Sequence, residues 1–239
     1  MSTPAAPFDL RQMPVFLRGA AGPIAGWLTQ PSARRVGFYV AVIMAGAGCF
    51  GATIGWWRAP TQALYTAIKL PLILLLTTLG NALLNGMLAL LLGLSLTFRQ
   101  SALAILMSFA IASAILGAFS PVMFFLVWNV PPLSTAGPVD WTAYRLILVT
   151  QAAAIAFAGV AANLRLGQLL RHVSGRPAIA RHVLLAWLAG NLFLGSQFAW
   201  VLRPFIGSPG LPLAFLRPDP FASNFYEALW GALKHLLFG

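Results

Sequence analysis

Residues 70–96 read LPLILLLTTLGNALLNGMLALLLGLSL and contain no charged side chain. A transmembrane helix needs about 20 consecutive apolar residues, so this stretch is long enough to cross a bilayer. It lacks the alternation of apolar and polar residues that a membrane β-strand shows. Because lipid cannot hydrogen-bond to the backbone, only helices and closed barrels span membranes. The stretch therefore predicts a transmembrane helix and sets the fold class of the chain.

Four further segments have the same character, which predicts an all-α, polytopic transmembrane helix bundle of about five spans. The expected spans are residues 36–57, 70–96, 102–128, 141–164 and 182–205. They form a central domain, residues 34–206, between an N-terminal interfacial region, residues 1–33, and a C-terminal region, residues 207–239. We expect interfacial amphipathic helices in both flanking regions. In the second, Asn224 and Glu227 have the spacing of a capping box.

The composition supports a membrane protein and argues against other classes. The 239 residues are 59% hydrophobic and 8% charged, whereas soluble domains carry roughly 25% charged residues. The formal net charge of +11 is typical of nucleic-acid-binding proteins, but here the basic residues flank the apolar spans. We therefore attribute them to membrane topology and to anionic lipid headgroups, and expect no nucleic acid as a partner. Cys49 is the single cysteine, so no internal disulfide is expected.

Lys and Arg are distributed unevenly between the two sides of the expected bundle. Cytoplasmic loops carry the excess of positive charge, and this predicts a cytoplasmic N-terminus. The loop 129–140 contains no Lys or Arg, as expected for an outer loop. With five spans, the C-terminus is then outside.

Five neutral amides lie within the expected spans and are candidates for lining a pore or for packing helices together: Asn81, Asn85, Gln151, Asn191 and Gln197. Asn81 and Asn85 are four residues apart and share a helix face. Small residues nearby favour helix packing, and the pairs Gly51–Gly55 and Ser113–Gly117 have the spacing of closely approaching helices. No Asp or Glu falls in the middle of a span, which argues against proton-driven transport.

Eight arginines are candidates for contacts with lipid headgroups or partner chains: Arg34, Arg35, Arg145, Arg171, Arg176, Arg181, Arg203 and Arg217. The last two lie in the stretch 202–227, LRPFIGSPGLPLAFLRPDPFASNFYE, which follows the fifth span. Pro204 predicts the end of the helix, and Arg203 is expected to reach the outer headgroups from there. We interpret the stretch as an exit and return of the chain, or else as a binding loop, with Arg217 near enough to Asp219 for an ion pair.

No catalytic residue, metal site or cofactor is expected. HExxH, GxSxG and Walker spacings are absent, and His, Cys, Asp and Glu form no cluster at helix spacing. His172 and His182 flank a basic loop, and a lipid-modifying enzyme built on that loop is the least favoured class. The leading hypothesis is a non-catalytic structural or accessory subunit, bound to anionic lipids and to other membrane chains as a homo- or hetero-oligomer. The alternative is a channel or carrier for a small neutral or anionic solute.

Residues 67–125 contain Lys69–Leu70–Pro71 before a long apolar span, the turn GLSLTFRQ at 93–100, and Ser120–Pro121. In these features the chain resembles the Yip1-type family of five-span membrane proteins. The resemblance implies a cytoplasmic N-terminus, five helices, and a role in membrane organisation or partner recruitment without catalysis. The long acidic N-terminal region of the eukaryotic members is absent, so their vesicle-trafficking functions are not carried over. The C-terminal RPFIGSP and NFYE stretches resemble those of uncharacterised bacterial relatives, which implies a bacterial inner membrane.

Overall fold

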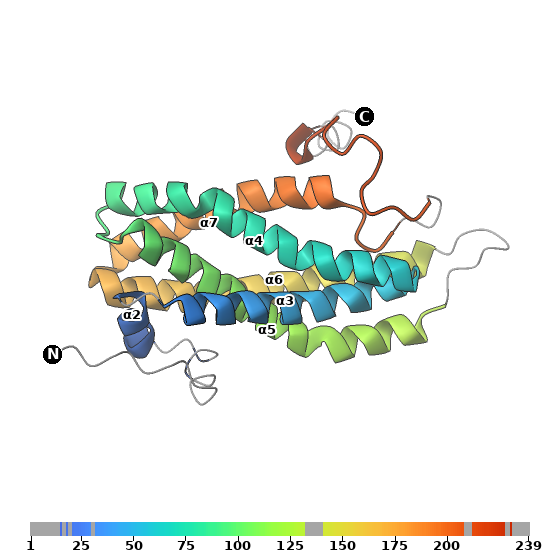
Figure 1. Cartoon of the computed structure of the whole chain (residues 1–239), viewed down its shortest axis with the longest axis horizontal. Helices are drawn as coiled ribbons and strands as arrows, with labels where there is room; N and C mark the ends of the chain where they lie inside the picture. Colours follow the sequence, from blue (N-terminus) through green and yellow to red (C-terminus); the bar gives the residue numbers. More distant parts are fainter. Residues whose placement is uncertain are drawn as a thin grey trace.

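The computed structural model describes residues 15, 18, 21–29, 32–131, 141–207, 212–227 and 230. Within these ranges the regular structure is helical and contains no strand, and Figure 1 shows the long helices lying side by side. The helices are α2 (Ala21–Thr29), α3 (Ala33–Trp56), α4 (Pro60–Leu91), α5 (Phe98–Asn129), α6 (Trp141–Ser174) and α7 (Pro177–Leu202). Five of them, α3 to α7, are long and apolar enough to cross a membrane. The chain is an integral membrane protein of the helix-bundle class, as the sequence predicts.

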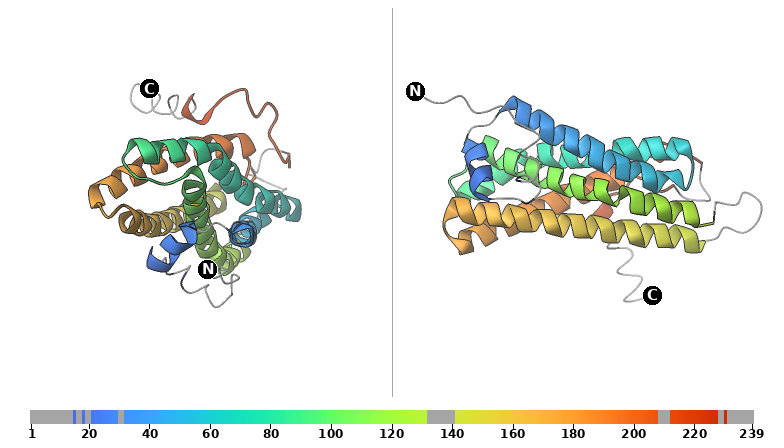
Figure 2. Two further views of the ribbon diagram at one scale, coloured as in Figure 1. Left: turned by 60° about the vertical axis from the view of Figure 1, so that its left-hand side comes forward. Right: turned by 90° about the horizontal axis from the view of Figure 1, so that it is seen from below.

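The five long helices run antiparallel to their chain neighbours, with α5 the most buried of them. α3 packs against both α4 and α5, whereas α7 packs against α4 and α6. One end of the bundle, which we call the α2 end, carries α2, the turn 92–97 and the turn 175–176 (Figure 2). The opposite end, which we call the Pro204 end, carries the turn 57–59 and the chain that follows α7. The charge bias predicts that the α2 end is cytoplasmic.

Glycines in α3 allow its backbone to touch two neighbouring helices. Gly51 and Gly55 face the start of α4, where a Cβ on Gly55 would lie 2.5 Å from the carbonyl oxygen of Gln62. On the α5 side, a Cβ on Gly117 would lie 3.0 Å from the Cα of Gly46. Small residues at such crossings are what hold membrane helices together, because lipid provides no hydrophobic drive for helices to associate. The spacing-based prediction of close packing is confirmed at both crossings.

α4 begins ten residues earlier than the apolar stretch predicts and ends five residues earlier. Pro60 occupies the first turn, where a proline is tolerated. The helix continues through Lys69 and Pro71, because neighbouring protein covers the charge and the interrupted backbone. It stops at Leu91, and Gly93 follows with a φ of 85°, a left-handed conformation that commonly ends helices.

α6 continues ten residues beyond its expected end at Leu164. The added turns are amphipathic: Leu166, Leu169 and Leu170 are buried, whereas Arg171 is exposed. α2 packs against α6, and Figure 2 shows it at this end of the helix. The added turns of α6 are therefore stabilised by protein contacts at the α2 end.

The two flanking regions are described in part. α2 lies in the predicted N-terminal interfacial region, while 1–14, 16, 17, 19, 20, 30 and 31 fall outside the described residues. At the other end the capping box forms, since Glu227 N–H donates to Asn224 Oδ1 over 2.9 Å and Asn224 N–H donates to Glu227 Oε2 over 3.2 Å. Most of the predicted C-terminal amphipathic helix lies outside the described residues.

Candidate functional site

Six of the seven buried polar side chains of α4 follow one another at spacings that keep them near one face of the helix. They are Gln62, Thr66, Lys69, Thr77, Asn81 and Asn85. Spacings of three, four and eight residues place side chains on neighbouring positions of a helix surface. This polar face is turned toward α7 and the chain that follows it, and the opposite side of α4 exposes leucines such as Leu79 and Leu83. We call it the polar face of α4.

The first part of the polar face binds the backbone that follows α7. Gln62 Nε2 donates to the carbonyl oxygens of Phe205 (2.6 Å) and Pro204 (3.1 Å). Thr66 Oγ1 donates to the same Phe205 oxygen over 2.6 Å. Non-helical backbone is tolerated at membrane depth only where protein satisfies its polar groups. Gln62 and Thr66 therefore allow α7 to end inside the bundle.

Lys69 is fully buried, and its Nζ donates to the Pro204 carbonyl oxygen over 2.8 Å. The ammonium lies 4.9 Å from the ring centroid of Phe215 and 5.9 Å from that of Tyr65. No ion pair with a carboxylate forms among the described residues. A helix C-terminus carries partial negative charge that favours a cation, and aromatic rings stabilise one as well. Lys69 thus caps the end of α7, and the two rings cover its charge.

These contacts place the end of α7 inside the bundle, beyond the start of α4 at Pro60. Lys69 follows Pro60 by nine residues, which is about 13 Å of helix. Beyond Pro204, Ile206 is only 3% exposed and Gly207 packs against Arg58. The chain then doubles back over α7 (Figure 1), so that Tyr226 stacks on Phe193 at 5.1 Å. Residues 203–207 are buried or half-buried against the start of α4 and the turn 57–59, and the exit of the chain to the outer surface stays a prediction.

The last part of the polar face forms an amide cluster with α7. Asn81 Nδ2 donates to Asn191 Oδ1 over 3.0 Å, and Asn85 Nδ2 approaches the same oxygen at 3.5 Å. Trp187 Nε1 donates to the backbone oxygen of Asn85 over 2.8 Å. Gly190 lets the helices come close, because a Cβ there would lie 3.3 Å from Asn81 Oδ1. Three of the five predicted amides therefore meet at one helix contact.

The two glutamines lie elsewhere. Gln197 Oε1 accepts the backbone N–H of Phe225 over 3.3 Å and so fixes the returning segment on α7. Gln151 belongs to α6, and its buried Oε1 has no hydrogen-bond partner among the described residues. The five amides therefore do not come together at one place.

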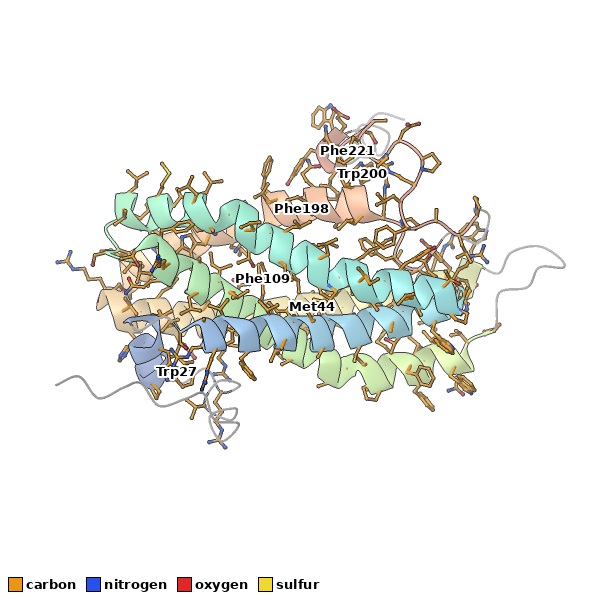
Figure 3. The ribbon with its side chains drawn as sticks, in the orientation of Figure 1. Trp27, Met44, Phe109, Phe198, Trp200 and Phe221 are labelled. Atoms are coloured by element: carbon orange, nitrogen blue, oxygen red, sulfur yellow. The ribbon has the colours of Figure 1, made fainter. Side chains whose placement is uncertain are left out.

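The eight predicted arginines divide into three groups. Five are exposed at the bundle ends: Arg34, Arg145, Arg171, Arg176 and Arg181. Arg35 is instead 5% exposed, and its Nη1 donates to the Trp27 carbonyl oxygen over 3.0 Å, with the guanidinium 5.2 Å from the indole centroid. It holds α2 on α3 and is therefore covered by protein instead of facing lipid. Trp27 is labelled on α2 in Figure 3.

Arg203 and Arg217 both lie on Trp200. Their Cζ atoms are 3.1 Å and 5.0 Å from its ring centroid. The expected ion pair of Arg217 with Asp219 does not form; Arg217 Nη2 donates instead to the carbonyl oxygen of Pro220 (3.0 Å) and to Ser223 Oγ (3.4 Å). Arg217 is thus held on the turn 219–223, in which Asp219 has a φ of 49°.

A cavity of about 480 Å³ opens at the α2 end. α2, the turn before α5, the first turn of α5 and the end of α6 line it, with Ser95, Gln100 and His172 as polar members. Gln100 also accepts the Thr97 N–H in the capping box that starts α5. His182 is not among the lining residues, so the two loop histidines do not share this cavity.

Sequence reasoning missed Gln62, Thr66 and Lys69 because it placed them before the span. Their spacing carried the signal: at positions i, i+4 and i+7 they share a helix face.

Comparison with models of protein families, with curated proteins and with solved structures found no match to this chain.

Two substitutions are expected to differ in their effect on the free energy of unfolding. Asn191→Leu removes the acceptor shared by Asn81 and Asn85 and should cost about 1–2 kcal/mol. Gln151→Leu removes a buried acceptor without a partner and should be neutral, or stabilising by up to about 1 kcal/mol. Unfolding of the purified protein by SDS titration measures both. Equal effects of the two substitutions would contradict the assignment of Asn191 to a helix contact.

Proposed function

We propose that the chain is a non-catalytic integral membrane protein that serves as a structural or accessory subunit of a membrane assembly. In this proposal it lies in a bacterial inner membrane with the N-terminus cytoplasmic and the C-terminus outside. Its partners are anionic lipids and other membrane chains, in a homo- or hetero-oligomer. The resemblance to the Yip1-type family agrees with partner recruitment as the role.

The observation that carries the proposal is the engagement of polar side chains within the bundle. Gln62, Thr66 and Lys69 bind the backbone after α7, and Asn81 bonds Asn191. A transport path needs polar groups that exchange their partners with a passing solute. Here the groups are held by the protein itself, which suits a rigid scaffold.

The outer side of α6 offers a surface for a partner chain. Large apolar side chains are exposed along it: Leu146, Val149, Ile155, Phe157, Val160 and Leu164. Ala152, Ala153 and Ala156 are exposed between them. Small residues let another helix approach closely, so this surface suits a helix as well as lipid.

The mass of the native particle tests the proposal. The full chain, 25.5 kDa, is extracted from its own membrane into lipid nanodiscs without stripping lipid, and its protein mass is measured by mass photometry. We expect a multiple of the chain or a second chain at fixed stoichiometry. Phe157→Ala should weaken that association, whereas Leu79→Ala, an exposed α4 control, should not. A single chain in every nanodisc would overturn the proposal.

The second candidate is a channel or carrier for a small neutral or anionic solute. One observation favours it: Thr77 Oγ1, Asn81 Oδ1 and Asn85 Oδ1 are buried without a hydrogen-bond partner among the described residues. Such oxygens offer a polar solute three acceptors between α4 and α7. Solute flux into liposomes that contain the protein distinguishes the candidates, because only a transporter gives a flux that Asn81→Leu reduces.

A further inference from the structure

Arg203 and Arg217 place two positive charges on one indole ring at the end of α7. Arg203 follows the last helical residue, and Arg217 returns to the same ring from the segment that doubles back over α7. Figure 3 shows Trp200 on α7 beneath that segment, which carries Phe221. Trp200 is itself fixed, because its Nε1 donates to the Ser223 carbonyl oxygen over 2.8 Å. The ring is thus a rigid platform for both guanidinium groups.

No acidic side chain in the described ranges neutralises the two charges. Arg203 makes no hydrogen bond or ion pair within the described part of the chain, and the Nε atoms of Arg203 and Arg217 are both buried without a partner there. The whole chain has only four acidic residues. Of the two that are described, Asp219 forms no ion pair with Arg203 or Arg217, and Glu227 caps the helix that follows Asn224. No carboxylate of the described residues therefore pairs with either guanidinium group.

The surroundings of Arg203 also disfavour its positive charge. Burial, together with the positive charge of Arg217, lowers the pKa of Arg203 from its ordinary value. Both causes oppose the charged form of an arginine, which remains charged in proteins. An anion near Arg203 and Arg217 would relieve this repulsion.

We propose that Arg203, Arg217 and Trp200 form a binding site for a phosphate-bearing anion, from a lipid headgroup or from free phosphate. Guanidinium forks match phosphate oxygens and form charge-assisted hydrogen bonds with them. Stacking on Trp200 orients the fork of Arg203 in advance, which lowers the entropy cost of binding. The site rests on one part of the proposed function, the binding of anionic lipids, and it needs no partner chain, so its test is separate from that of the assembly.

Lipid binding to the purified full-length protein tests the site. Native mass spectrometry measures the affinity for phosphatidic acid, for phosphatidylglycerol, and for a lipid that carries a carboxylate in place of the phosphate. The double variant Arg203→Gln, Arg217→Gln should bind both phosphate lipids roughly tenfold or more weakly than the wild type. Arg145→Gln, the control at an exposed arginine of the same end, should bind them as the wild type does.

A competition with inorganic phosphate shows whether the bound anion comes from a lipid headgroup or from free phosphate. If inorganic phosphate binds with the same dependence on Arg203 and displaces the lipid, free phosphate is the source; if it does not, the source is the headgroup. Equal binding by the double variant and the wild type, or equal binding of the carboxylate and phosphate lipids, would overturn the proposal. Should the double variant fail to fold, Arg203→Gln alone replaces it, because Arg203 holds no other residue by a hydrogen bond in the described part of the chain.

Discussion

Lys69→Glu should lower the free energy of unfolding by about 3 kcal/mol or more. The substitution puts a carboxylate against the Pro204 carbonyl oxygen, where Lys69 Nζ donates over 2.8 Å. It also puts negative charge at the negative end of α7 and against the rings of Tyr65 and Phe215. At about 2–4 °C per kcal/mol for a chain of this size, the melting temperature should fall by about 6 °C or more, as measured by differential scanning fluorimetry in detergent.

Lys69→Met is the matched control. It removes the charge and the hydrogen bond but fills the same volume with an apolar side chain. Replacing a buried charge by an apolar group of similar size is often nearly neutral, so we expect a change within about 1.5 kcal/mol. Equal stability of Lys69→Glu and Lys69→Met would show that the side chain does not lie at the end of α7.

Gly51→Leu should cost about 3 kcal/mol or more, because its new side chain has no space. A Cβ on Gly51 would lie 2.8 Å from the carbonyl carbon of Thr66 and 3.1 Å from the nitrogen of Ala67. Both contacts are with backbone, so a rotamer change cannot relieve them and α3 must move away from α4. That movement also displaces Thr66, whose hydroxyl binds Phe205.

Gly37→Leu tests the same change in the same helix where space is free. No heavy atom lies within 4 Å of a Cβ built on Gly37, and leucine is the better helix former by roughly 0.5–1 kcal/mol. We therefore expect Gly37→Leu to be neutral or mildly stabilising. Unfolding of both variants by SDS titration measures the difference. If Gly51→Leu behaved as Gly37→Leu does, α3 and α4 would not be in backbone contact.

The bundle was predictable from the sequence because hydropathy over about 20 residues reports directly on the solvent around a helix. Helix ends were less predictable, since they depend on tertiary contacts. The hydropathy window begins after Lys69, because a charge counts as polar whether or not protein covers it. α6 passes Leu164 because α2 and neighbouring helices bury Leu166 and Leu169, and hydropathy carries no information on that contact.

The candidate site was predictable in part. Asn81 and Asn85 share a face by spacing alone, and their approach to Asn191 required the pairing of α4 with α7, which one sequence does not specify. Arg35 illustrates the converse case. Its place in a basic pair at the start of a span is typical of a headgroup contact, yet the position of α2 makes it a buried donor to Trp27.

The central claim is that α7 ends inside the bundle and that α4 covers the chain after it. Labelling of a cysteine by a water-soluble maleimide tests this most directly, in nanodiscs and in a Cys49→Ser background. Ile206→Cys should react roughly tenfold or more slowly than Arg176→Cys, which lies in the exposed turn before α7, because a buried thiol reacts only on local opening. Lys69→Glu should raise the Ile206→Cys rate. Equal rates at positions 206 and 176 without that substitution would show that the chain leaves the bundle after α7, and would contradict the account.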